Sequence, residues 1–219
     1  MQTARKINLQ IALDLGERSQ LLELARQVQD DVDWLEAGTP WIIAEGMGAV
    51  RALRSSFPDK FIVADVKIMD GGYYEAELAF RAGANLVTVL GVASDATISE
   101  VARAARDHKG AVVVDLMCVA DVVRRAEQVT ALGADYIGIH TASDDRKTGR
   151  DPIADLGLFA GKNVAPLIPA GGIGLRNIKE VVAYSPAAVV VGSAITRASN
   201  PAEVARRLRE ALREADERR

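Results

Sequence analysis

Eight short runs of apolar, often β-branched residues alternate along this chain with segments of helical spacing, and this alternation limits the possible folds more than any other feature. Runs of this kind read as strands buried on both faces, and helices cover such strands in α/β proteins. The apolar runs lie at residues 7–13, 32–35, 61–66, 86–90, 112–116, 136–139, 165–168 and 188–191. The amphipathic segments lie at residues 19–28, 45–54, 73–81, 98–106, 121–132, 175–183 and 201–212.

The length of the repeat favours a closed barrel. In a chain of 219 residues, eight units leave about 27 residues for each strand, helix and pair of loops, which is close to the minimum for a (β/α)₈ barrel. We therefore predict a single (β/α)₈ TIM barrel over residues 1–219, with a charged C-terminal helix end at 206–219. A doubly wound open sheet would show the same alternation, so the polar residues must decide between the two.

Composition excludes several classes of partner. The net charge is −3 and the isoelectric point is near 5.5, which gives no general attraction for nucleic acid or anionic lipid. No apolar stretch approaches the length of a membrane span. Cys118 is the single cysteine, so no intramolecular disulfide can form, and we expect it to be buried at a strand end. We expect a cytoplasmic protein that binds neither nucleic acid nor membrane.

Polar residues or glycines follow nearly every apolar run. In a (β/α)₈ barrel the carboxyl ends of all the strands meet at one rim, where the active sites of this fold are built. A single such residue would be weak support, whereas a complete ring favours an enzyme. The ring consists of Asp14, Glu36, Asp65, Lys67, Asp115, His140, Gly171, Gly172 and Gly192.

Asp65 and Lys67 are the strongest candidates for chemistry. Alternation along a strand places these two side chains on the same face, while Val66 faces the helix layer. Charged side chains at a barrel mouth need each other or a ligand, because burying a charge alone is costly. The alternative for this motif alone, the less favoured one, is a structural ion pair.

Two glycine loops and a histidine complete the candidate site. Gly171 and Gly172 follow the seventh run, while Gly192 and Ser193 follow the eighth, and these are the strands after which many barrels bind phosphate. His140 ends the sixth run, where a histidine suits proton transfer.

These residues resemble the orotidine-monophosphate-decarboxylase superfamily, and within it the branch of 3-hexulose-6-phosphate synthases and 3-keto-L-gulonate-6-phosphate decarboxylases. The similarity runs over residues 9–212. It is carried by Gln10-Ile11-Ala12-Leu13-Asp14, Glu36-Ala37-Gly38-Thr39-Pro40, Ala64-Asp65-Val66-Lys67-Ile68-Met69-Asp70, Val87-Thr88-Val89-Leu90-Gly91, Ile139-His140-Thr141, Ala170-Gly171-Gly172 and Val190-Val191-Gly192.

The resemblance implies a homodimer with active sites at the subunit interface, acting on a phosphorylated pentulose or hexulose. Glu36 and Asp65 match the positions that hold Mg²⁺ in this branch, and Lys67 matches the lysine that neutralises developing enolate charge. Asp70 matches an aspartate donated to the neighbouring site, and Asp14 matches a residue near the substrate hydroxyls. Such a site stabilises an enediolate.

Within the branch, the sequence favours the synthases, which are aldehyde-lyases. The decarboxylases carry an arginine three residues after the histidine, where this chain has Ser143. The expected reaction joins formaldehyde to D-ribulose 5-phosphate and gives D-arabino-hex-3-ulose 6-phosphate, with His140 as the base. Two alternatives stay open, namely a sugar-phosphate decarboxylase and a non-catalytic sugar-phosphate binding protein. The second would not need Lys67 beside Asp65 and Glu36.

Overall fold

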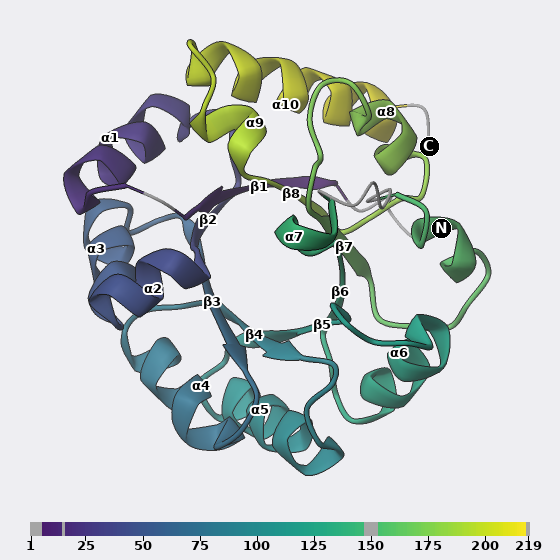
Figure 1. The fold of residues 1–219 in the computed structure, drawn as a ribbon. Helices are drawn as coiled ribbons and strands as arrows, with labels where there is room; N and C mark the ends of the chain where they lie inside the picture. The colour runs from purple at the N-terminus through teal and green to yellow at the C-terminus, as the bar shows by residue number, and fades with distance from the viewer. Residues whose placement is uncertain (1–5, 15, 147–152, 218–219) are drawn as a thin grey trace.

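Eight parallel strands form a barrel surrounded by helices in the computed structural model, which describes residues 6–14, 16–146 and 153–217 (Figure 1). The strand order is β7-β6-β5-β4-β3-β2-β1-β8, and the N–H of Ala187 bonds to the carbonyl oxygen of Leu167 where β8 comes beside β7. The predicted (β/α)₈ barrel is confirmed. The strands are β1 (Asn8–Leu13), β2 (Trp34–Ala37), β3 (Phe61–Ile68), β4 (Leu86–Leu90), β5 (Ala111–Asp115), β6 (Tyr136–His140), β7 (Leu167–Ala170) and β8 (Ala188–Val191).

Except for α7, the helices occupy the outer ring (Figure 1). Each of the seven predicted amphipathic segments overlaps a helix. They are α1 (Arg18–Val28), α2 (Thr39–Glu45), α3 (Gly48–Ser56), α4 (Gly72–Arg81), α5 (Asp95–Asp107), α6 (Val122–Ala131), α7 (Ser143–Arg146), α8 (Ile178–Val182), α9 (Ser193–Thr196) and α10 (Pro201–Glu217), with a 3₁₀ turn η1 (Leu156–Phe159).

Two sequence-based expectations were wrong. The helix predicted over residues 45–54 is divided, because Gly46 takes a left-handed φ of 58° and ends α2 before α3 begins. Cys118 is exposed instead of buried, since the chain turns after β5 with a φ of 64° at this residue and carries the thiol out of the strand.

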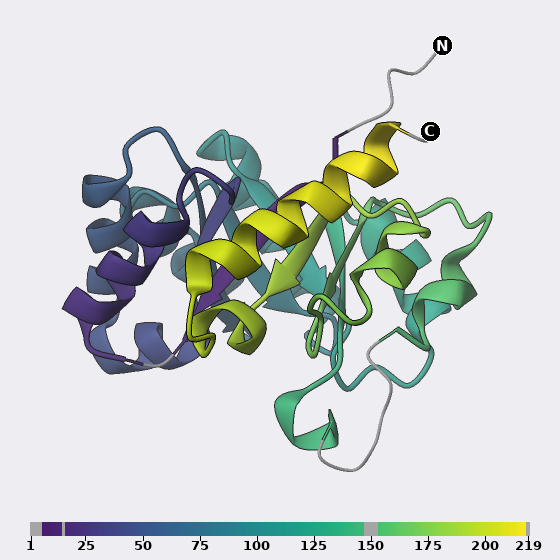
Figure 2. The same ribbon diagram turned by 90° about the horizontal axis from the view of Figure 1, so that it is seen from above.

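The barrel interior is packed with side chains at the amino ends of the strands. A separate apolar cluster fills this end, with the Trp34 ring stacked on Phe61 at 4.5 Å between centroids. Most of the remaining apolar residues pack between the strands and the helices. Only the carboxyl end of the barrel is therefore left for polar side chains, and α7 lies over that end (Figures 1 and 2). Among the described residues, no helix is long and apolar enough to cross a membrane.

The C-terminal helix α10 is fixed to the start of the barrel by a buried ion pair. Arg209 is 4% exposed and bonds to the Asp33 carboxylate, which also accepts the Lys6 ammonium at 2.7 Å and the Leu9 N–H at 2.8 Å. Burial alone would raise the pKa of Asp33, but the hydrogen bonds from Lys6, Arg209 and Leu9 outweigh it and hold that pKa below its ordinary value.

Replacing Asp33 should therefore destabilise the fold in a pH-dependent way. We expect Asp33→Asn to lower the free energy of unfolding at pH 7 by about 3 kcal/mol, because the buried Arg209 guanidinium loses its counter-charge. The folded-state pKa is depressed, so this contribution is present above the unfolded pKa of about 3.9 and disappears as pH falls through the folded pKa.

Urea unfolding of wild type and variant at pH 7 and at pH 3 measures this effect. The difference between the two proteins should shrink at the lower pH. The control is Glu23→Gln, which removes one partner of a surface pair whose side chains are 59% and 51% exposed, and it should change stability little at either pH. An Asp33→Asn difference that is equally large at both pH values would contradict the assignment.

Candidate active site

Strand β3 leaves the regular ladder where its charged residues begin. Ala64 pairs with Val87 and Ile68 pairs with Val89, so residues 65–67 of β3 lie opposite the single residue Thr88 of β4. Lys67 has a left-handed φ of 53°, which is uncommon for a side chain of this size. The contact between Asp65 and Lys67 thus comes from a bulge, and not from the regular alternation that the sequence suggested.

The bulge brings the Lys67 ammonium onto the Asp65 carboxylate. Asp65 is 7% exposed, and its Oδ2 accepts Lys67 Nζ and the Thr39 hydroxyl, the latter at 2.6 Å. Burial alone would raise the pKa of Asp65, but the Lys67 charge and these hydrogen bonds lower it below its ordinary value. Burial would likewise lower the pKa of Lys67, but the Asp65 carboxylate raises it. Lys67 is therefore a permanent cation at the barrel mouth.

A second buried carboxylate lies beside this pair. Glu36, at the end of β2, is 6% exposed, and its Oε2 accepts the Gln10 side-chain amide at 2.5 Å. Burial, followed by the nearby Asp65 charge, raises the pKa of Glu36 well above its ordinary value, although Lys67 opposes the rise. A site that buries two carboxylates against one ammonium favours a further cation.

Asp14 follows β1 on the same rim. A Cβ atom on Gly38 would come within 2.1 Å of the Asp14 carboxylate, so only glycine at position 38 allows Asp14 to lie here. A Cβ on Gly192 would lie 3.6 Å from the other Asp14 oxygen. Asp14 therefore stands between the ends of β2 and β8, next to the loop that begins with Gly192 and Ser193, and its charge also acts on Glu36.

His140 ends β6 and forms a dyad with Asp115 at the end of β5. Nδ1 of His140 lies 2.9 Å from Oδ2 of Asp115, which is 5% exposed and accepts the Met117 N–H through its other oxygen at 2.9 Å. Because a carboxylate only accepts hydrogen bonds, the neutral imidazole that fits this contact carries its proton on Nδ1 and presents a lone pair on Nε2. The Asp115 charge also acts on Lys67, which links the dyad to the bulge in β3.

The glycine loop after β7 adjoins the dyad. Gly171 and Gly172 have φ values of 93° and 74°, and a Cβ on Gly171 would lie 2.5 Å from the Thr141 carbonyl oxygen and 3.4 Å from His140 Cδ2. Glycine thus lets this loop pass close to the histidine. Asn177 braces the loop, since its side chain accepts the Gly174 N–H at 2.9 Å and donates to the Gly172 carbonyl at 3.1 Å.

Asp70 lies apart from the buried charged groups of the site. It lies exposed on the loop between β3 and α4, and its carboxylate accepts the N–H of Gly71 at 2.7 Å. Exposed apolar side chains lie on the same segment, with Met69 52%, Tyr74 75% and Leu78 60% exposed. Such a grouping is typical of an interaction surface.

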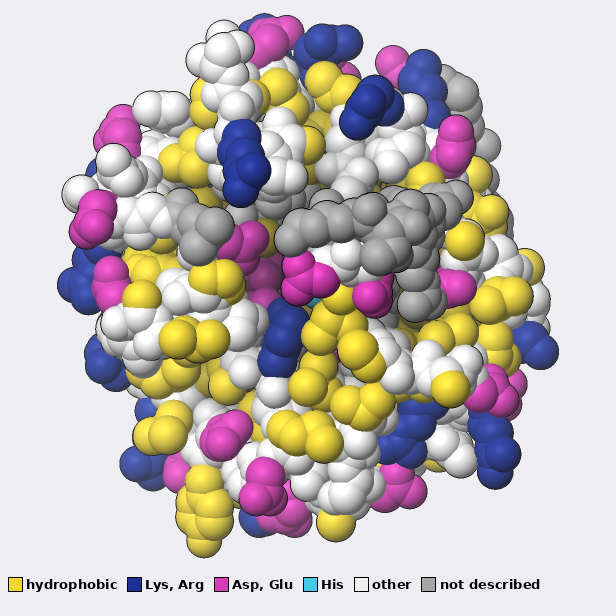
Figure 3. Space-filling view, in the orientation of Figure 1, with side chains coloured by type: hydrophobic (Ala, Val, Ile, Leu, Met, Phe, Trp, Pro, Cys, Tyr) yellow, Lys and Arg dark blue, Asp and Glu magenta, His cyan; other side chains and the backbone are white. Residues whose placement is uncertain are grey.

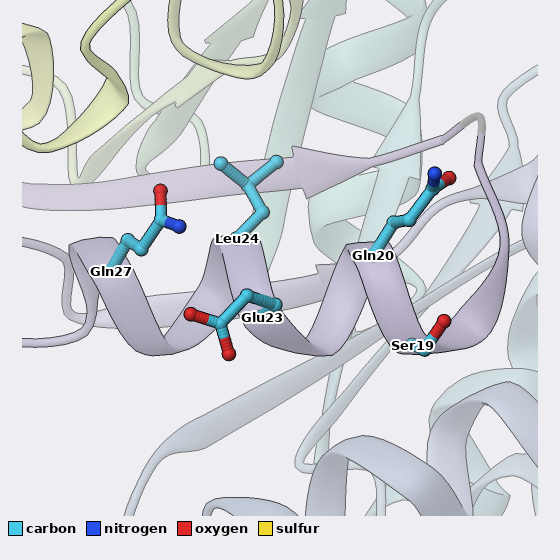
Figure 4. Close-up of a pocket in the computed structure, with 5 residues that line it drawn as sticks. All are labelled: Ser19, Gln20, Glu23, Leu24 and Gln27. Carbon is cyan, nitrogen blue, oxygen red and sulfur yellow. The ribbon is translucent and has the colours of Figure 1, made fainter.

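Charged side chains gather at the barrel mouth in the space-filling view. Lys or Arg, Asp or Glu, and His side chains meet at the centre of the face over the barrel, with hydrophobic side chains around them (Figure 3). A hollow elsewhere follows the outer face of α1, and its lining comes from that one helix, which brings no acid–base group opposite another (Figure 4). It is lined by Ser19, Gln20, Glu23, Leu24 and Gln27.

Sequence reasoning missed the uncharged residues that support the site. Thr39 and Thr88 both bond to Asp65, Gln10 bonds to Glu36, and Asn177 braces the glycine loop. Asp115 was noted at its strand end but not given a role beside His140. A threonine within a strand reads as an ordinary β-branched residue, so only its place opposite the Asp65–Lys67 segment could have indicated Thr88.

Comparison with known proteins shows which family the chain belongs to. The model of the orotidine 5'-phosphate decarboxylase / HUMPS family matches residues 7–208. A 3-hexulose-6-phosphate synthase from Mycobacterium gastri is 43% identical over 209 residues, covering 94% of this chain and 100% of the relative.

Solved structures give the same picture. The crystal structure of 3-hexulose-6-phosphate synthase from Salmonella typhimurium has a TM-score of 0.93 and 41% identity, covering 95% of this chain and 100% of that one. A 3-keto-L-gulonate-6-phosphate decarboxylase from Vibrio cholerae has a TM-score of 0.82 and 28% identity, covering 95% and 98%. The resemblance drawn from the sequence is confirmed, with higher identity to these synthases than to this decarboxylase. The chain belongs to the orotidine 5'-phosphate decarboxylase / HUMPS family.

Proposed function

We propose that this protein is a 3-hexulose-6-phosphate synthase, an aldehyde-lyase that joins formaldehyde to D-ribulose 5-phosphate. The observation that carries the proposal is the buried Lys67 ammonium held by Asp65 beside Glu36, at the same mouth as the His140–Asp115 dyad. A cation placed near a base of this kind suits a reaction in which negative charge develops on a substrate oxygen. The 43% identity to the Mycobacterium gastri synthase supports the same reaction.

His140 is the base in this proposal. Nε2 removes a proton from C1 of ribulose 5-phosphate, and the C–H electron pair moves toward the C2 carbonyl to give an enediolate. C1 then forms the new bond to the formaldehyde carbon, whose carbonyl electrons move to oxygen, and protonated His140 returns its proton to that alkoxide. Lys67 stabilises the negative charge at the substrate oxygens, and Asp115 holds His140 in the tautomer that can accept the proton.

The buried carboxylates fit a magnesium ion. Mg²⁺ takes one or two protein carboxylates and keeps its other positions for water and substrate oxygens. Within the part of the chain that the structure describes, no group of three or more metal-binding side chains occurs, so a site with two carboxylates is the kind to consider. Glu36 and Asp65 are the residues that would hold it, since both are buried and the Asp65 charge raises the pKa of Glu36. When bound, the ion would supply Lewis-acid stabilisation of negative charge.

The remaining predicted residues bind the sugar phosphate in this proposal. Gly171 and Gly172 on one loop, and Gly192 and Ser193 on the next, offer backbone N–H groups to the phosphate. Asp14 stands next to Gly192 and would accept hydrogen bonds from the substrate hydroxyls.

Asp70 acts across a homodimer interface in this proposal. Its exposed position and the neighbouring apolar side chains Met69, Tyr74 and Leu78 suit a surface covered by a second copy of the chain. A symmetric contact there would place each Asp70 against the other subunit, where it could reach the partner site.

A decarboxylase is the second candidate, favoured by the 28% identity to the Vibrio cholerae enzyme. It would form the same kind of enediolate by losing CO₂ and would then add a proton to it. Ser143, at the start of α7, stands where the decarboxylases carry arginine. The Ser143 side chain lies outside the described part of the structure, but serine is smaller than arginine and supplies no cationic proton donor. A non-catalytic binding protein would not need the dyad and the buried lysine together.

The deciding experiment measures both reactions of the purified protein with Mg²⁺. We expect formaldehyde to be consumed with ribulose 5-phosphate far faster than CO₂ is released from 3-keto-L-gulonate 6-phosphate, and chelation to abolish turnover. Ser143→Arg should lower kcat/KM for condensation more than for decarboxylation, because the two reactions are two fates of one kind of intermediate. The control is Ser19→Arg on the outer face of α1. Faster decarboxylation by the wild type would overturn the synthase assignment.

A further inference from the structure

Thr88 occupies a special position in the sheet. It is the single residue of β4 opposite residues 65–67 of β3, where the regular pairing of these two strands is interrupted. Backbone groups within such an interruption lose their ladder partners and need others, because a buried N–H group without a partner is costly. The Thr88 side chain is 8% exposed and faces this gap.

One hydroxyl group contacts both members of the charged pair. The Lys67 backbone N–H donates to Thr88 Oγ1 at 2.8 Å, and Thr88 Oγ1 lies 2.9 Å from Asp65 Oδ1. Because the Asp65 carboxylate only accepts, the hydroxyl must donate its proton to Asp65 and use a lone pair for Lys67. The direction of both bonds is thereby fixed.

Thr88 and Thr39 hold different parts of the pair. Thr39 Oγ1 contacts Asp65 Oδ2 at 2.6 Å, the Asp65 carbonyl oxygen at 2.8 Å and Lys67 Nζ at 3.1 Å. Thr88 instead holds the Lys67 backbone, at the residue whose φ is 53°. A left-handed backbone at a residue of this size persists only when its surroundings hold it.

We propose that Thr88 is a positioning residue, whose hydroxyl keeps Lys67 in its left-handed conformation and so aims the ammonium at the reacting oxygens. The positioning role rests on the proposed function for its effect on turnover, whereas the backbone restraint is independent of any reaction. Thr88 itself touches no substrate in this assignment. It acts by holding Lys67 and the Oδ1 oxygen of Asp65.

The test compares Thr88→Val, which keeps the shape and removes the hydroxyl, with Thr88→Ser, which keeps the hydroxyl. The matched control is Thr130→Val, because Thr130 on α6 also makes two hydrogen bonds, donating to the Ala126 carbonyl at 2.7 Å and accepting the Ala165 N–H at 3.0 Å. All four proteins are compared for amide hydrogen exchange in the ligand-free state, and for kcat and KM with ribulose 5-phosphate and formaldehyde.

We expect Thr88→Val to speed exchange of the Lys67 amide about tenfold, since one hydrogen bond that protects it is lost. Its kcat should fall by about ten- to a hundredfold with KM for the sugar phosphate nearly unchanged, because a small displacement of a charge-stabilising group acts on the transition state. Thr88→Ser should stay within about threefold of wild type in both measurements, and Thr130→Val should keep its kcat.

Unchanged Lys67 exchange in Thr88→Val would overturn the proposal, as would Thr88→Ser behaving like Thr88→Val. A fall in kcat equally large in Thr130→Val would assign the effect to general destabilisation and would also overturn it. A wild type that fails to condense the two substrates would instead remove the proposed function, and the amide exchange would still decide whether Thr88 restrains Lys67.

Discussion

Lys67→Ala should lower kcat for condensation about a thousandfold. Removing a charge-stabilising group from a water-poor site typically lowers kcat by about a hundred- to a thousandfold. The loss here is at the upper end, because two buried carboxylates are also left without their ammonium. The Lys67 side chain is 20% exposed and contacts Asp65, which makes it the cation best placed at the barrel mouth. Steady-state kinetics with ribulose 5-phosphate, formaldehyde and Mg²⁺ measure the effect. KM for the sugar phosphate should change far less than kcat, since the glycine loops hold the phosphate.

The matched control is Lys179→Ala on the exposed surface of α8, which should retain wild-type kinetics.

The inactive Lys67→Ala variant also tests whether the two subunits share their active sites. Mixed with Asp70→Ala under conditions of proven subunit exchange, Lys67→Ala should recover part of the activity, because a mixed dimer would contain one intact site. A Lys67→Ala protein that is folded and turns over at more than a tenth of the wild-type rate would contradict the role given to this lysine.

The fold could be predicted because the apolar runs, the amphipathic segments and the repeat length all indicated the same architecture. Apolar runs such as residues 86–90 and 188–191 coincide with β4 and β8 to the residue. The errors arose where a local backbone choice decided the outcome. Gly46 ends α2 through a left-handed conformation, and a helical pattern that continues past it gives no warning. Short helices such as α9 were not predicted, because four residues are too few to show a helical periodicity.

The charged part of the candidate site could also be predicted, because strand ends of a closed barrel converge whatever their details. Glu36, Asp65 and Lys67 lie together at the mouth as expected, although a bulge and not regular alternation brings Lys67 to Asp65. What the sequence could not indicate was how they are held. The bulge in β3 depends on strand pairing, and the two bonds of Thr88 follow from that bulge. Neutral hydrogen-bonding residues have no pattern of their own.

The geometry also explains how the site can bury charged groups, whose burial without partners would destabilise the fold. Asp65 has four hydrogen-bonding contacts from Lys67, Thr39 and Thr88 to its side chain and backbone, which compensate for its burial. Glu36 has fewer partners, and burial raises its pKa. A bound cation would offset this burial.

Asp115→Asn should impair removal of the C1 proton while leaving the substrate-binding groups in place. The Asp115 carboxylate accepts the His140 Nδ1–H at 2.9 Å and leaves Nε2 with the lone pair. An amide in its place can donate to Nδ1 instead, which would put the proton on Nε2 and remove the base. Since the corresponding change in a Ser-His-Asp triad costs about 10⁴-fold through the wrong tautomer, we expect a loss of about 10³-fold or more here.

The measurement that isolates this step is exchange of the C1 proton of ribulose 5-phosphate with deuterated water in the absence of formaldehyde. Wild type should exchange one C1 proton rapidly, while Asp115→Asn and His140→Ala should both lose exchange and condensation to the same degree. Asp135→Asn is the control, because the Asp135 carboxylate accepts the Val112 N–H at 2.9 Å at the opposite end of the barrel and should affect stability alone. If His140→Ala still exchanged the proton at the wild-type rate, another group would be the base, and the dyad would have to act later, when the new alkoxide takes up its proton.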